Sequence, residues 1–376
     1  MAEITPELLT PVISGEPPAF QHCAYMTRDL GIVQFAHLRE PDLSSGFCVD
    51  DNARALLAAI LVLALRDDCE AARALGEAAL RFMEMAQRPD GQYHNLTDAD
   101  GNFLDDIGSP DCFGRAMWAC GVAARCAGSA DWRERSKRLL TQSLPQMDSL
   151  EFLRPRAYAM LGLAAALDPV KAAPLPPVAG PLDRATGEEA ERALRLLAQQ
   201  LLVDYDAHAS ADWPWWEDEL VWGNARPPEA MLRAAAVLGD AALRQRGMRA
   251  LEFLAQATQP AAMLTPVGNL GWYPRGGTCA VYDQQPIEAC AMTDMWLAAA
   301  RLTGDATYYR KALDAFSWFL GKNTENIIMA DTHTGGCYDG LRQGGHNHNM
   351  GAESTLSYVH AHAVVALAAR EHEHAR

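Results

Sequence analysis

The chain has 376 residues, a formal net charge of −16 and 49% hydrophobic residues. This balance excludes bulk disorder, and the scattered lysines and arginines argue against a nucleic-acid partner or an anionic membrane surface. The nine cysteines form no C-x-x-C pair, the N-terminal segment lacks a signal-peptide pattern, and no apolar run approaches membrane-spanning length. We therefore expect a soluble, cytoplasmic protein with reduced thiols.

Helical periodicity dominates the chain, and two kinds of helix alternate along it. Segments that are apolar almost all round are predicted at 51–65, 111–127, 155–167, 226–238, 285–302 and 353–370. Amphipathic segments are predicted at 70–86, 132–145, 187–204, 241–257 and 306–320, with 5–12 or 26–38 as a possible sixth. Because an all-apolar helix must be buried on every side, the alternation predicts an all-α (α/α)6 barrel, with six inner helices wrapped by an outer ring.

The stretch 168–186 differs in composition from its surroundings. It contains five prolines and shows no periodicity, which predicts a surface loop. Because the alternation of the two helix types continues beyond it, we expect a single (α/α)6 domain over residues 1–376 and not two domains joined by a linker.

Long loops rich in Gly, Trp, Tyr and Asp precede five of the apolar helices. They span 42–55, 98–118, 212–230, 271–289 and 331–355. Since each loop enters the N-terminal end of a predicted inner helix, we expect the loops to converge at one mouth of the ring.

Carboxylates are concentrated in these loops. An acid at a helix N-terminus is commonly a cap, and Asp51 and Asp111 suit that role. The runs Asp50–Asp51 and 217–219, however, exceed what capping needs. Glycoside hydrolysis requires two carboxyl groups, one protonated and one ionised. The predicted catalytic candidates are Asp50, Asp51, Asp111, Glu217, Asp218 and Asp283.

Aromatic and polar side chains accompany the acids. An aromatic ring can cover the apolar C–H face of a sugar, although the tryptophans of 213–222 could instead fill the core beneath their loop. Arg54, Arg115 and Arg226 lie near acids, where they could orient carboxylates or bind an anionic sugar. The predicted substrate-binding residues are Asn52, Arg115, Trp215, Trp216, Trp222, Asn224, Trp272, Tyr282, Gln284, Gln285, Glu288, Tyr338, Asp339, His346, His348 and Glu353.

The pair His346 and His348 could also suggest a metal. Two histidines at i and i+2 in a glycine-rich loop, with no third ligand fixed by spacing, are a weak signal. No phosphate-binding G-x-x-x-x-G-K-[ST] and no G-x-S-x-G motif occurs. We therefore predict neither a metal nor a cofactor.

Four segments, together with the six predicted hairpins, resemble the six-hairpin glycosidase superfamily. They are GFCVDDNARAL (46–56), WWEDELVWGNARPPEAML (215–232), YDQQPIEA (282–289) and GGCYDGL…NMGAEST (335–355). The resemblance implies the (α/α)6 toroid, a fold that serves hydrolases, lyases, phosphorylases and epimerases. Members that hydrolyse unsaturated uronyl sugars use two aspartates at inner-helix N-termini, and Asp51 and Asp111 occupy comparable places. The segments are also similar to a bacterial family found alone or joined to glycosyltransferase domains, which implies a functional association with a glycosyltransferase.

Three functions fit these features. We favour a glycoside hydrolase acting on a bacterial oligosaccharide or polysaccharide, because acids and aromatic residues occur together in the same loops. A sugar epimerase or isomerase would need a general base, with His346 or His348 as the candidate. A non-catalytic carbohydrate-binding module accompanying a glycosyltransferase would depend on the tryptophans but not on the acids.

Overall fold

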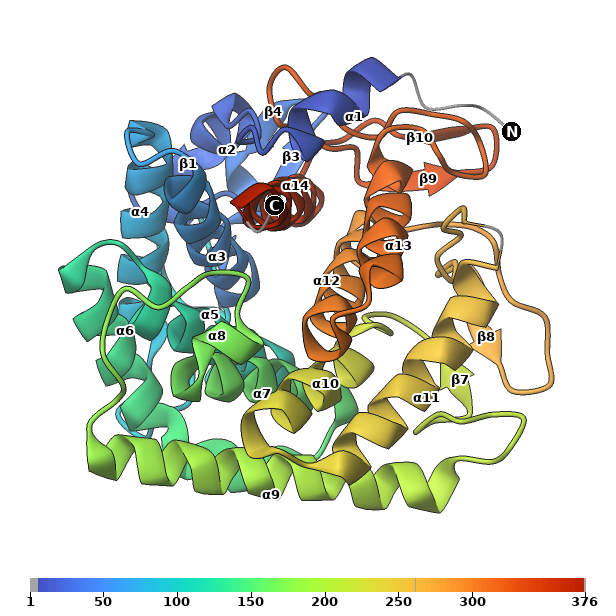
Figure 1. The fold of residues 1–376 in the computed structure, drawn as a ribbon. Coiled ribbons are helices and arrows are strands. Elements are labelled where there is room, and N and C mark those ends of the chain that lie inside the picture. Colours follow the sequence, from blue (N-terminus) through green and yellow to red (C-terminus); the bar gives the residue numbers. More distant parts are fainter. Residues whose placement is uncertain (1–5, 261, 375–376) are drawn as a thin grey trace.

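The computed structural model describes residues 6–260 and 262–374, and its helices form two concentric rings (Figure 1). The inner ring consists of α3 (Val49–Leu65), α5 (Pro110–Cys126), α7 (Leu153–Leu167), α10 (Arg226–Leu238), α12 (Pro286–Thr303) and α14 (Ala352–His374). The outer ring contains α4 (Glu70–Ala86), α6 (Ala130–Ser143), α9 (Arg184–His208), α11 (Ala241–Thr258) and α13 (Ala306–Phe316). Each inner helix contacts the next one along the chain, and α14 contacts α3, which closes the ring. The predicted (α/α)6 barrel is confirmed.

Two short helices, α1 (Pro6–Ile13) and α2 (Gln21–Met26), pack against α14 and supply the sixth outer element. The predicted segment 5–12 is therefore helical, apart from residue 5, which lies outside the described residues. The alternative segment, 26–38, instead forms short strands.

The local sequence explains where the inner helices begin and end. Proline occupies the first turn of α5, α10 and α12, where its fixed φ suits a helix start and its missing N–H costs nothing. Helices α10 and α12 end at Gly239 and Gly304, which adopt the left-handed conformation that glycine tolerates. None of the described helices is long and apolar enough to cross a membrane.

Five two-stranded antiparallel ribbons tie the loops together. They are β1–β2 (Thr27–Arg28, Gly31–Ile32), β3–β4 (Phe35–His37, Glu40–Asp42), β5–β6 (Phe47–Cys48, Leu96–Thr97), β7–β8 (Glu219–Leu220, Tyr273–Pro274) and β9–β10 (Gly340–Arg342, Gly345–Asn347). Short 3-10 helices span η1 (Leu43–Ser45), η2 (Leu144–Ser149) and η3 (Ser317–Phe319). Ribbons β5–β6 and β7–β8 join loops that belong to different hairpins, so the inner-helix entrances are fixed relative to one another.

The proline-rich stretch only partly matches the predicted surface loop. It begins with the short helix α8 (Pro169–Ala172), and Ala172, Ala173 and Leu175 are buried. The guanidinium of Arg233 on α10 donates to the carbonyl of Ala172, and Arg301 Nη1 on α12 lies 2.6 Å from the carbonyl oxygen of Ala173. The first part of the stretch therefore packs against inner helices, because its apolar side chains and free carbonyls find partners there.

Candidate active site

The first turns of four inner helices surround a polar pocket of about 380 Å³, a size typical of small-molecule sites. Helix α3 contributes Asp50, Asp51 and Arg54, and α5 contributes Arg115. The remaining lining residues are Gln34, Phe35, Cys48, Asn95, Leu96, Gln285, Pro286, Asp339, Gly351, Glu353 and Ser354. We call this cavity the mouth pocket. The predicted convergence is thus present, although the loop 212–230 supports the pocket from behind and does not line it.

Asp50 and Asp51 are consecutive residues in the first turn of α3, so their side chains diverge by about 100° around the helix axis. Asp50 is bound by Arg115 and accepts a hydrogen bond from Asn95 Nδ2 at 3.0 Å. Burial alone would raise the pKa of Asp50, but Arg115 and Arg54 hold it below its ordinary value. Burial raises the pKa of Asp51 to about 6, against the opposing effect of Arg54. The pocket therefore holds an ionised carboxylate beside one that is protonated in mildly acidic solution.

Arg54 joins two carboxylates within the pocket. Its Nη1 lies 2.7 Å from Asp51 Oδ1, and its Nη2 lies 2.6 Å from Glu353 Oε2 on α14. Two carboxyl groups from different inner helices therefore share one guanidinium. The same contacts link the first and last inner helices at the mouth.

Helices α3 and α5 are not capped by Asp51 and Asp111, the residues that the sequence suggested for this role. The Sγ of Cys48 accepts a hydrogen bond from the Asp51 amide of α3, and Ser109 Oγ accepts one from the Cys112 amide of α5. The carboxylates of Asp51 and Asp111 are consequently not used as caps. Asp111 Oδ1 is buried without a hydrogen-bond partner, and burial raises its pKa although Arg115 opposes the shift.

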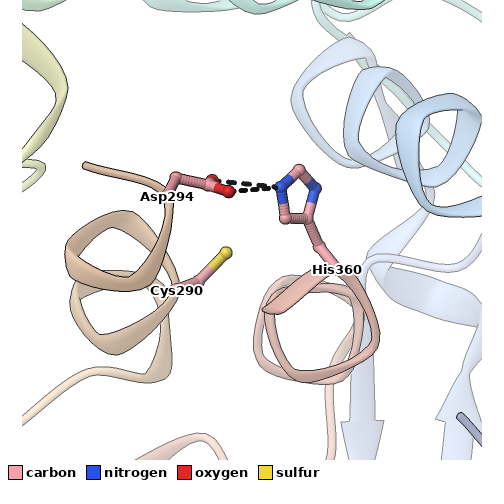
Figure 2. Close-up of side chains that lie close together, drawn as sticks. All are labelled: Cys290, Asp294 and His360. Atoms are coloured by element: carbon pink, nitrogen blue, oxygen red, sulfur yellow. Dashed lines mark hydrogen bonds and ion pairs between the residues drawn. The ribbon is translucent and has the colours of Figure 1, made fainter. Parts of the chain in front are cut away.

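A small cavity of about 20 Å³, with room for about one water molecule, lies beside the mouth pocket. It shares Arg54 and Arg115 with the mouth pocket, and its further polar residues include Tyr158, Arg226, Cys290, Ser357 and His360. Figure 2 shows His360 on one helix facing Asp294 and Cys290 on another. His360 Nε2 lies 3.1 Å from Asp294 Oδ1, so a carboxylate orients the imidazole.

The donor atoms of Cys290, Asp294 and His360 lie within 4.8 Å of one another, close enough to suggest a metal site. However, Arg226 Nη1 lies 2.8 Å from Asp294 Oδ2, and Arg226 Nη2 lies 3.8 Å from Cys290 Sγ. Burial alone would raise the pKa of Asp294, but His360 and Arg226 hold it well below its ordinary value. A guanidinium thus already supplies the positive charge that a metal would bring, and we assign the cluster to a buried ion-pair network.

The predicted tryptophan platforms are placed differently. Trp215 and Trp216 are buried, with 0% and 3% of their surface exposed, and they pack on each other at a ring separation of 5.1 Å. They fill the core and offer no ring face to a ligand, which corrects the sugar-binding prediction for both. Trp222 is half-buried, and the guanidinium groups of Arg115 and Arg154 lie 5.5 Å and 5.1 Å from its ring.

Four other predicted binding residues hold the backbone in place. Asn52 accepts a hydrogen bond from the Ile32 amide. Asn224 accepts a hydrogen bond from the amide of Val221 and donates one to its carbonyl. Gln284 donates to the carbonyl of Val281 at 2.9 Å and accepts from the indole of Trp318. Glu288 accepts from the amides of Gly223 and Asn224. All four side chains are at most 5% exposed, so the structure gives them a supporting role and corrects the prediction of substrate contact.

Besides Asp111, three predicted catalytic acids do not line the mouth pocket. Glu217 forms a bidentate pair with Arg154, at 2.9 Å for both contacts. Asp218 is exposed and lies 3.6 Å from Arg275. Asp283 lies 3.2 Å from Arg342 of β9, and burial raises its pKa. We therefore no longer place these three acids among the catalytic groups.

The aromatic residues of the last two loops form their own clusters. Tyr338 stacks on His346 at 3.8 Å, and His348 lies 4.6 Å from the His346 ring. Tyr282 donates to Glu325, and Trp272 is half-buried against the core. Asp339 lines the mouth pocket, but it also accepts from Ser354 Oγ at 2.5 Å and from the Gly351 amide at 2.8 Å.

Sequence reasoning missed several residues that line or support the pocket. Gln34, Phe35 and Asn95 lie in short ribbons or loops with no motif. Hydrogen bonds to distant segments, from the Ala352 amide to Gln34 and from Asn95 to Asp50, hold these loops at the mouth. His360 lies within a helix predicted to be apolar all round. A polar residue at an otherwise buried helix position was the available signal.

No protein-family model and no curated protein sequence matches the chain. Solved structures match it over nearly its whole length. A sugar epimerase from a ruminal bacterium has a TM-score of 0.68 at 11% identity, covering 95% of this chain and 98% of its own. Cellobiose 2-epimerase from Bacillus thermoamylovorans has a TM-score of 0.70 at 12% identity, with coverages of 97% and 98%. The GH76 α-mannanase of Bacteroides thetaiotaomicron has a TM-score of 0.61 at 11% identity, with coverages of 94% and 95%.

At such identities the likeness establishes the fold. The chain has the (α/α)6 toroid that these solved structures share, which is the fold that the resemblance implied. Within that class, this chain is a toroid whose mouth holds consecutive aspartates and a guanidinium that binds two carboxylates.

Proposed function

We propose that the protein is a glycoside hydrolase that acts on a bacterial oligosaccharide or polysaccharide at the mouth pocket. The observation that carries the proposal is the pair Asp50 and Asp51, which line one pocket and whose different ion-pair partners shift their pKa values in opposite directions. A protonated and an ionised carboxyl group are the two components that glycoside hydrolysis requires. The mannanase and endoglucanase among the structural neighbours support a carbohydrate ligand.

The opposite pKa shifts support the following roles. Asp51 is the general acid: it gives its proton to the glycosidic oxygen as the bond from that oxygen to the anomeric carbon breaks. Asp50 is the ionised partner, which either takes a proton from the attacking water or attacks the anomeric carbon itself. Arg54 positions Asp51, and Arg115 keeps Asp50 ionised.

The test is reducing-sugar release from a panel of oligosaccharides by the wild type, Asp51→Asn and Asp50→Asn. Loss of a general acid typically costs 10²- to 10⁴-fold, so we expect kcat to fall by roughly that range in each variant. Asp218→Asn is the matched control, because this exposed acid lies outside the pocket and should keep full activity. Thermal unfolding of each variant checks that the fold is retained.

Two outcomes contradict the proposal. Full activity in Asp51→Asn would exclude it as the acid. Binding of sugar without any cleavage by the wild type would favour the non-catalytic module instead.

A sugar epimerase or isomerase is the second candidate, and the His360–Asp294 pair is the observation that favours it. A histidine oriented by a carboxylate is the kind of general base that this reaction needs, and His360 lines the small cavity that shares Arg54 and Arg115 with the mouth pocket. Because that cavity has room for about one water molecule, this function requires it to widen when a sugar binds. His360 replaces His346 and His348, which are not among the residues that line either cavity. Chromatography of the same reactions separates the candidates: sugar interconversion without cleavage, lost in His360→Asn and retained in Asp51→Asn, would support the isomerase.

A further inference from the structure

We propose that Phe35 is a stacking platform for a second sugar ring, so the substrate has at least two sugar units. Phe35 lines the mouth pocket and is 55% exposed, although it is a large apolar side chain. Its pocket neighbours are mainly carboxylates and amides, which bind hydroxyl groups. An apolar ring beside such groups matches the two chemical surfaces of a pyranose, an apolar C–H face and a hydroxyl edge.

The backbone fixes the direction of this ring. Phe35 begins strand β3, where exposed and buried residues alternate, so the pleat turns Phe35 outward while Ala36 faces the core. The Phe35 amide donates to Ser45 Oγ at 3.0 Å, which holds the strand against η1.

Hydrogen bonds also join the same ribbon to the start of α14 and to the loop before it. The carbonyl of Gln34 accepts from the Ala352 amide at 3.0 Å, directly before Glu353 at the start of α14. The Leu38 amide at the end of the ribbon donates to Asn349 Oδ1 at 3.0 Å. Phe35 therefore lies on a ribbon with a fixed position relative to Glu353 and, through Arg54, relative to Asp51.

The depth of the two groups implies separate sugar units. Asp51 is 3% exposed and Phe35 is 55% exposed, although both line the same pocket, and from this difference we infer that Asp51 lies deeper than Phe35. A ring that reaches Asp51 leaves the Phe35 face free for the next ring of the chain. This inference rests on the proposed carbohydrate function, and it adds the minimum length of the substrate and the residue that selects for it.

The test measures binding by calorimetry in the Asp51→Asn background, which prevents turnover. Cellobiose and mannobiose are the two-unit probes, and glucose and mannose are the one-unit probes. Phe35→Ala should weaken disaccharide binding roughly tenfold, through lost apolar contact, and leave monosaccharide binding unchanged. Phe35→Trp should keep disaccharide binding at the level of the parent protein, because it retains an aromatic ring. Phe152→Ala is the matched control, because Phe152 is 62% exposed just before α7 but does not line the pocket.

Three results overturn the platform: unchanged disaccharide affinity in Phe35→Ala, an equal loss for one-unit and two-unit probes, or no disaccharide binding to the parent protein. The hydrolase proposal fails separately. If Phe35→Ala shows the expected selective loss but the wild type cleaves nothing, the platform stands and the hydrolytic role falls. If the wild type cleaves the substrate but Phe35→Ala has no effect on binding, the hydrolytic role stands and the platform falls.

Discussion

Asp51 is almost fully buried, and it shares the cation beside it, Arg54, with Glu353. Desolvation therefore outweighs attraction, and the pKa rises to about 6. Asp50 is also buried, but Arg115 and Asn95 both bind its carboxylate, so its pKa falls. Asp50 and Asp51 are adjacent in the sequence, but consecutive helix positions face different neighbours. Their pKa values therefore shift in opposite directions, which suits Asp51 to act as the acid and Asp50 as the base.

This difference predicts the pH dependence of hydrolysis. Since Asp51 must be protonated to act as the acid, kcat/KM should fall as pH rises through about 6, approaching a tenfold loss per pH unit. On the acidic side, activity should persist until Asp50 is protonated, below the ordinary carboxyl range. A pH–rate profile from pH 3 to 9 checks both limbs. Activity that increases between pH 6 and 8 would contradict the assignment, because it would require Asp51 to act as a base.

The sequence pointed to some of the residues that line the mouth pocket and misplaced others. Asp50, Asp51, Arg115 and Glu353 could be predicted, because each lies in the first two turns of a helix with a clear apolar pattern. Whether an aromatic residue in a loop is exposed depends instead on packing by distant segments. For that reason the buried Trp215 was predicted as a platform.

At the scale of elements, α5 and α7 approach so closely that glycine is required between them. A Cβ on Gly121 would lie 2.0 Å from the carbonyl oxygen of Gly162, and one on Gly162 would lie 2.1 Å from that of Met117. These obstacles are backbone atoms, so a side chain can be accommodated only if the helices separate. This contact fixes the spacing of two inner helices, one of which carries Arg115 into the pocket.

We therefore expect Gly162→Ala to destabilise the protein by about 1–3 kcal/mol, the usual cost of overpacking. Gly187→Ala in the outer helix α9 is the control. The nearest atom to an added Cβ there is 4.0 Å away, so alanine should stabilise the helix by up to about 1 kcal/mol. Denaturant unfolding of both variants measures the difference. Equal stabilities would show that α5 and α7 are not in this close contact.

The helix boundaries were easier to predict than the ribbons. Inner helices begin within about two residues of their predicted starts, because apolar runs and proline at the first turn mark them. Strands of two or three residues, such as β3, are too short for alternation to be recognised. Two of the ribbons also pair segments that are far apart in the chain, as β5 does with β6.

For the molecule as a whole, the ring brings the first and last thirds of the chain to one site. Helix α14 packs beside α3, and Arg54 joins their carboxylates at the mouth. Away from the mouth, α8 and the residues that follow it accept hydrogen bonds from Arg233 and Arg301. A ligand therefore has a polar cavity at the N-terminal ends of the inner helices, within reach of acids from both ends of the sequence.

The most direct test is a crystal structure of Asp51→Asn soaked with cellobiose or mannobiose. We expect one sugar unit to lie between Asp50 and Glu353, near position 51, and the second to lie over the ring of Phe35. A disaccharide bound elsewhere, or bound at the mouth without contact to Asp50 and position 51, would contradict the central claim that this pocket holds the carbohydrate for hydrolysis.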